Sequence, residues 1–102
     1  MSEFVGGDYV TVKAACELRP GTAPFFIPML VVLLEHDEDL KGAPLSEAEV
    51  LARRDSASCI QMRVEDYIAM HDRRGPDLDP NNLWADWLHF KQTGELTYIP
   101  II

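Results

Sequence analysis

The segment "LSEAEVLARRDSASCIQMRV", residues 45–64, decides the fold because it predicts a helix followed by a strand. Ser46 and Glu49 have the spacing of a capping box, in which the serine hydroxyl accepts from the amide three residues later and the glutamate accepts from the serine amide. A helix is therefore predicted to begin at Ser46. From residue 58 to residue 64 apolar and polar side chains alternate, which is typical of a β-strand.

Two stretches that precede this segment predict further strands. In residues 9–16, "YVTVKAAC", successive side chains alternate between a more apolar and a more polar face, which predicts a strand. Residues 29–34, "MLVVLL", are entirely apolar, which is typical of a central strand covered on both faces. Strand, helix and strand in this order predict a right-handed βαβ crossover, so that residues 29–34 would run parallel to residues 58–64.

Residues 75–88, "GPDLDPNNLWADWL", allow two interpretations. Oxygen ligands at alternate positions from Asp77 onward resemble the first half of a calcium loop. A calcium loop also needs Gly at its sixth position and Glu at its twelfth, where this chain has Asn82 and Leu88. The sequence therefore favours a helix with Asp79 as N-cap and Pro80 as its first residue, ending near residue 91, and predicts no metal site here.

The elements together predict a mixed α+β fold in a single domain over residues 1–102. The expected core is a small mixed sheet of three to four strands with one βαβ crossover and about three helices packed on it. A further helix is predicted from Val64 to a stop at Gly75. Residues 1–8 are predicted to be flexible, and residues 95–102, "ELTYIPII", to form an apolar C-terminal arm or an edge strand.

The charge balance limits the classes of partner. Seventeen acidic residues against nine basic ones give a formal net charge of −8, and such a surface repels phosphate. Nucleic acids and anionic membranes are therefore excluded as expected partners. The longest apolar run, residues 25–34, contains Pro28 and is much shorter than the roughly 20 residues that span a membrane. We expect a soluble, cytoplasmic protein in which Cys16 and Cys59 are reduced and buried.

The densest charge is "EHDED", residues 35–39, directly after the predicted central strand. His36, Asp37 and Asp39 could hold a divalent cation or perform acid and base catalysis there, with Glu65 or Asp66 beside them if the crossover exists. The alternative is a solvated acidic loop, which is the commoner outcome. The sequence favours this alternative and predicts no catalytic residue, no bound metal and no cofactor.

Apolar side chains near the C-terminus are candidates for a partner surface. The helix that begins near Pro80 has one broad aromatic face, which either completes the core or leaves some rings exposed at its edges. The candidate partner-binding residues are Trp84, Phe90, Tyr98, Ile101 and Ile102.

These observations favour a non-catalytic protein-binding module of the interaction, inhibitor or immunity type. Its expected partner is a basic protein, or a second copy of the chain bound through the C-terminal arm to form a homodimer. The alternative is a small metal-dependent or acid/base enzyme that uses residues 35–39, so the sequence leaves open whether the chain is an enzyme.

Overall fold

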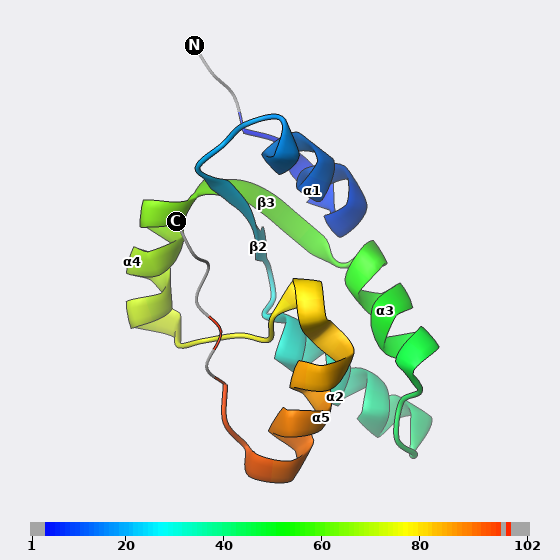
Figure 1. Ribbon diagram of the computed structural model, residues 1–102. Helices are drawn as coiled ribbons and strands as arrows, with labels where there is room; N and C mark the ends of the chain where they lie inside the picture. The colour runs from blue at the N-terminus through cyan, green and yellow to red at the C-terminus, as the bar shows by residue number, and fades with distance from the viewer. Residues whose placement is uncertain (1–3, 97, 99–102) are drawn as a thin grey trace.

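Three short strands form one antiparallel sheet in a computed structural model of the chain, which describes residues 4–96 and 98 (Figure 1). The strands are β1 (Gly6–Asp8), β2 (Thr22–Phe26) and β3 (Ser58–Arg63), and β3 lies in the centre with the order β1-β3-β2. The register pairs Ile60 with Gly6 on one side and with Phe25 on the other.

Five α-helices and one 3₁₀ helix surround this sheet in the described residues. They are α1 (Tyr9–Glu17), α2 (Leu30–Lys41), α3 (Glu47–Ser56), α4 (Val64–Arg74), η1 (Pro80–Asn82) and α5 (Leu83–Thr93). Across the ranges that the structure describes, none of these helices combines the length and the apolar character that crossing a bilayer requires.

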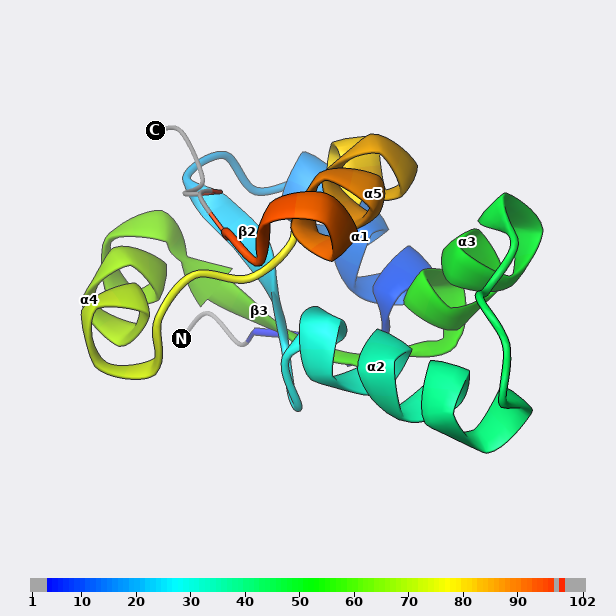
Figure 2. The same cartoon turned by 90° about the horizontal axis from the view of Figure 1, so that it is seen from below.

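The two faces of the sheet are covered by different helices. Phe25 and Phe26 follow one another in β2, so their side chains point to opposite faces. Phe26 stacks on Tyr9 of α1 with ring centroids 5.3 Å apart, whereas Phe25 meets Tyr67 of α4 edge to face at 5.1 Å. Helix α1 therefore covers one face and α4 the other. Figures 1 and 2 show α2, α3 and α5 gathered on the same side as α1.

The main hydrophobic core lies between the α1 face of the sheet and these helices. Trp87 of α5 is its largest fully buried side chain, with 1% of its surface exposed. Other core residues with almost no exposed surface are Val12, Phe26, Leu30, Leu34, Val50, Leu78 and Leu83. Because these residues come from all parts of the chain, the helices depend on one shared core.

Four predicted elements are confirmed. Helix α3 has Ser46 as N-cap, and both hydrogen bonds of the capping box with Glu49 are present. The predicted strand after it is β3, and the helix predicted to stop at Gly75 is α4. The last predicted helix begins as η1, where the Asp79 side chain accepts from the amide of Asn81 at 2.9 Å, and continues as α5.

The prediction of a strand at residues 9–16 is wrong, because this stretch is α1. Asp8 caps the helix by accepting from the Thr11 amide at 2.8 Å. The buried side chains are Tyr9, Val12 and Cys16, at helical spacing. The apolar residues of this stretch fit both periodicities, and the N-cap decides between them.

The predicted strand at residues 29–34 is also wrong, because it is the first half of α2. Met29 offers no side-chain cap at the start of this helix. The cap comes instead from Asp77, whose two carboxylate oxygens accept from the amides of Leu30 and Val31 at 2.7 and 2.9 Å. A helix start that is stabilised by a residue so far along the chain carries no local sequence signal.

The predicted βαβ crossover is therefore absent, and the sheet is antiparallel where a mixed sheet was expected. The second strand lies in residues 22–26, where the sequence predicted no strand. Within residues 1–8, which were predicted to be flexible, Gly6–Asp8 form β1. Of the arm at residues 95–102, the structure describes residues 95, 96 and 98.

Candidate functional site

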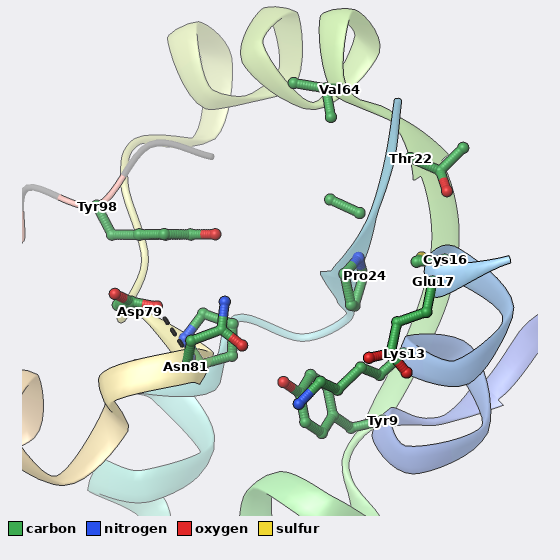
Figure 3. A pocket seen from close by; sticks show the side chains of 12 residues that line it. Tyr9, Lys13, Cys16, Glu17, Thr22, Pro24, Val64, Asp79, Asn81 and Tyr98 are labelled. Carbon is green, nitrogen blue, oxygen red and sulfur yellow. Dashed lines mark hydrogen bonds between the residues drawn. The ribbon is translucent and has the colours of Figure 1, made fainter. Parts of the chain in front are cut away.

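A pocket of about 440 Å³ opens between α1, the edge of β2 and the segment that leads into η1 (Figure 3). This volume is within the range of small-ligand pockets, roughly 300–1,000 Å³. One wall carries Tyr9, Lys13 and Glu17, and the opposite wall carries Asp79 and Tyr98. The pocket thus combines two aromatic rings with two carboxylates and one ammonium group.

Helix α1 places three of these side chains in a row. Tyr9, Lys13 and Glu17 are four residues apart, so they lie on one side of the helix. The sequence interpretation missed them because it assigned this stretch to a strand and did not place Asp79 or Tyr98 beside it. The signal that could have found them is the N-cap Asp8, which accepts from the amide of Thr11.

Tyr9 is held firmly at the base of the pocket. It is almost fully buried, and its ring stacks on Phe26. The Arg54 guanidinium carbon lies 5.1 Å from the ring centroid, and Lys13 Nζ lies 5.9 Å from it. Burial raises the pKa of Tyr9 above its usual value near 10, against the lowering effect of Arg54. The hydroxyl is therefore protonated at neutral pH.

Tyr98 forms the opposite side of the pocket. Its backbone makes an isolated antiparallel bridge with Asp77, and Figure 3 shows its hydroxyl pointing into the pocket. Burial raises the pKa of Tyr98 to about 12, and the charge of Asp79 and the presence of Tyr9 act in the same direction. Tyr98 therefore offers a neutral hydroxyl and a ring face to whatever enters.

The acidic groups of the pocket have few partners within the chain. Asp79 uses Oδ1 to cap η1, and its backbone amide donates to Asp86 Oδ2 at 2.8 Å. In the part of the chain that the structure describes, neither Glu17 nor Asp79 forms an ion pair. With Lys13 as the third charged side chain, the lining carries one positive and two negative charges, a net charge of −1.

The edge of β2 that borders the pocket faces away from β3. The Ile27 amide donates to the Ser58 carbonyl at 3.0 Å, and the Val64 amide donates to the Gly21 carbonyl at 2.9 Å. The odd-numbered residues of this segment therefore bond to β3, and the carbonyls of residues 22, 24 and 26 point outward. Pro24 is tolerated here because an outward position needs no amide hydrogen.

A second hollow of about 390 Å³ adjoins the pocket along α1. The two share Tyr9, Lys13 and Glu17, and the second is completed by Arg54 and Asp55. These last two side chains pair with each other, because Arg54 Nη2 lies 2.9 Å from Asp55 Oδ1. The second hollow therefore adds surface beside the pocket, and the two charges that belong to it alone, Arg54 and Asp55, are paired.

The one thiol of the pocket is not activated. Burial raises the pKa of Cys16, so the side chain is a protonated thiol at neutral pH. A catalytic cysteine needs a lowered pKa, because only the thiolate is a good nucleophile. Cys59 is also buried, and burial raises its pKa to about 12. Both cysteines are buried and free, as predicted.

The residues of the acidic segment 35–39 lie in α2 and do not converge on one point. His36 and Asp39 are exposed on the helix surface. Asp37 Oδ2 is 3.0 Å from Arg53 Nε, and Glu38 accepts from Lys91 Nζ. These acidic side chains therefore connect α2 to α3 and α5.

The companion residues Glu65 and Asp66 lie elsewhere. They lie in the first turn of α4, and both pair with Arg63. Its Nε atom is 3.7 Å from Glu65 Oε1 and 2.9 Å from Asp66 Oδ2. Figures 1 and 2 show α4 well apart from α2, so the predicted proximity of the two clusters is wrong. Across residues 4–96 and 98, no group of three His, Cys, Asp or Glu side chains is placed to hold a metal ion.

The predicted partner-binding residues have different surroundings. Trp84 and Phe90 are partly buried against the core, and Phe90 stacks on Trp87 with centroids 5.9 Å apart. Tyr98 lines the pocket. Ile101 and Ile102 lie outside the described residues, so their role as a partner surface stays a prediction.

Comparison with known proteins adds no family to this geometry. No protein-family model, curated protein or solved structure matches the chain. The chemistry of the pocket itself is therefore the basis for a functional proposal.

Proposed function

We propose that this chain is a non-catalytic binding module for a basic protein, and that the pocket beside α1 is the centre of the contact surface. The observation that carries the proposal is the state of the groups in that pocket. Its two tyrosines and its cysteine are protonated at neutral pH, and its carboxylates are not placed against an activated nucleophile. Such groups offer hydroxyl, aromatic and carboxylate contacts to a partner, and the thiol does not have the lowered pKa of a catalytic nucleophile.

The charge of the chain supports a basic partner. A net charge of −8 attracts a cationic surface over a distance of about one Debye length, roughly 8 Å at physiological ionic strength. Electrostatic complementarity raises the association rate and excludes acidic competitors. The Tyr98 ring in the pocket supplies the aromatic anchor that such an interface needs.

Affinity capture at two salt concentrations tests the proposal. Immobilised protein is expected to retain a basic protein from lysate at about 0.01 M ionic strength and to release it near 1 M, where the Debye length falls to roughly 3 Å. The retained protein counts as the partner only if it binds again after purification. Partners that are neutral or acidic, or a retained protein that is indifferent to salt, would contradict the proposal.

A further inference from the structure

We propose that the pocket takes the side chain of an arginine residue of the partner protein. The inference rests on the proposed function, because it names the group by which the basic partner is recognised. Three features of the described residues support this inference. The chain already binds one of its own arginines at the same strand edge, the pocket offers aromatic and carbonyl groups, and its two carboxylates form no ion pair within the described residues.

The chain itself shows how the outer edge of β2 holds an arginine. Arg74 of α4 places its guanidinium carbon 3.9 Å from the centroid of the Phe25 ring. Its Nη1 donates to the outward carbonyl of Phe26 at 2.7 Å. The guanidinium thus combines stacking on an aromatic face with a hydrogen bond to the strand edge, which are the two contacts that its planar shape allows together.

The pocket offers the same combination two residues earlier on the same edge. The carbonyl of Pro24 points outward from the edge of β2, as does the Phe26 carbonyl that accepts from Arg74. The Tyr98 ring takes the place of Phe25 as the aromatic surface, because the Tyr9 ring is almost fully buried against Phe26. Figure 3 shows Pro24 between Tyr98 and helix α1. A guanidinium can stack on such a ring and donate to the carbonyl at once.

The pocket also contains two carboxylates that form no ion pair within the described residues. Glu17 and Asp79 lie on opposite walls, and neither forms an ion pair with another residue in the ranges that the structure describes. An arginine fork presents five N–H donors in fixed directions and can donate to two acceptors at once, whereas a lysine ammonium is a compact, strongly hydrated charge. This difference assigns the pocket to arginine.

The ammonium group of Lys13 would repel the guanidinium of an arginine that enters the pocket. It lines the pocket between Tyr9 and Glu17, with its ammonium directed at the Tyr9 ring. Because like charges repel, Lys13→Gln is expected to tighten arginine binding by about threefold, the order of an exposed charge interaction. Weaker binding of an arginine derivative to this variant would mean that Lys13 supports the bound ligand and does not repel it, and would overturn the proposal.

Titration with a small arginine derivative, followed by amide NMR spectra, tests the site directly. N-acetyl-arginine amide is expected to shift the signals of Thr22, Ala23, Asn81 and Tyr98. N-acetyl-citrulline amide has the same shape without the charge, and N-acetyl-lysine amide has the charge without the planar fork. Both are expected to bind more weakly. Equal shifts with either compound, or no shifts at these residues with the arginine derivative, would overturn the assignment.

A matched pair of double variants separates the pocket from the general charge of the surface. Glu17→Gln with Asp79→Asn removes two charges from the pocket, and Asn retains the ability to cap η1. Glu35→Gln with Glu47→Gln removes two charges from exposed positions on α2 and α3. The first pair is expected to weaken binding of the arginine derivative about tenfold and the second by less than about twofold. Equal losses would overturn the proposal.

The two proposals fail in different ways. If a basic protein is captured in a salt-dependent manner but the arginine derivative leaves the pocket signals unchanged, the module binds its partner elsewhere and only the arginine site is lost. If the derivative binds in the pocket and no basic protein is captured, the arginine site is supported and the proposed function is contradicted.

Discussion

Asp77 is a buried carboxylate that organises three separate backbone positions. Only 3% of its surface is exposed, and it accepts from the amides of Leu30, Val31 and Leu78 at 2.7, 2.9 and 2.8 Å. Burial raises its pKa, while the amide donors and Arg74 act in the opposite direction. The residue that resembled the first ligand of a calcium loop is therefore a structural cap, and amides occupy both of its oxygens.

Replacing Asp77 by Ala is expected to lower the free energy of unfolding by roughly 2–4 kcal/mol. The reason is that three buried or partly buried amides lose their acceptor at once, and each unsatisfied donor is costly. Urea denaturation measures the loss, and hydrogen exchange should show the amides of Leu30 and Val31 losing protection first. Asp79→Ala, which removes an N-cap to one amide, is the control and should cost about 1 kcal/mol. An equal loss in both variants would contradict this account.

Arg74 can be tested with its neighbour as control. Arg74→Lys keeps the charge but loses the planar fork that stacks on Phe25 and donates to Phe26, so we expect a loss of about 1–2 kcal/mol in stability. Arg73 is exposed in the same turn, and Arg73→Lys should change stability by less than about 0.5 kcal/mol. Thermal unfolding of both variants decides the matter. Similar melting temperatures would show that the strand edge does not select arginine.

At the scale of the element, the correct predictions are those whose signals lie within the element. Helix α3 carries its own capping box, β3 alternates, and α5 follows Asp79 and Pro80. The sequence carries no local signal for the start of α2, whose cap comes from Asp77, or for β2, which contains Pro24 and is possible only as an edge strand. Tertiary context decided both cases.

The candidate site was not predictable for the same reason. Its walls come from α1, from the edge of β2 and from the segment around residues 79–81, and the sequence interpretation assigned the first two incorrectly. Among the described residues, Tyr98 is the one candidate from the sequence that also lines the pocket. The sequence interpretation chose it for the apolar character of the C-terminal arm, whereas the structure places it in a pocket. The high density of acidic residues alone suggested a site at residues 35–39. In the structure, acidic side chains of this segment pair with residues of α3 and α5.

The capping box of α3 gives a pH-dependent prediction. Hydrogen bonds from Lys41 and from the Ser46 amide lower the pKa of Glu49 from 4.5 to about 2. A carboxyl group whose pKa is lower in the folded state stabilises the fold above its unfolded pKa. We therefore expect the stabilising effect of Glu49 to be complete above pH 4.5 and to be lost as the pH falls toward 2.

Carboxyl NMR titration measures this pKa, and denaturation of wild type and Glu49→Gln at several pH values measures the stability difference. The difference between the two proteins should shrink between pH 4.5 and pH 2. Glu47→Gln is the control, because Glu47 lies in the same helical turn but is outside the capping box. A Glu49 carboxyl that titrates near pH 4.5 would contradict the prediction.

At the scale of the whole molecule, the C-terminal arm returns to its own chain at Tyr98. Its bridge to Asp77 and its place in the pocket connect residue 98 to the segment between α4 and η1. A chain shortened to end at residue 96 is therefore expected to be less stable and to have the same oligomeric state as the full-length protein. Light scattering together with thermal unfolding tests this. A dimer that dissociates on truncation would instead support self-association through the arm.

The distance along the chain between α2 and its cap has a consequence for biosynthesis. A nascent chain that has exposed only residues 1–60 contains all of α2 but lacks the carboxylate that accepts from the amides of Leu30 and Val31, 47 and 46 residues before it. Short helices are marginal in water without such support. We therefore expect this helix to stay unformed on the ribosome until Asp77 has left the exit tunnel, with its apolar side chains accessible to chaperones during that interval.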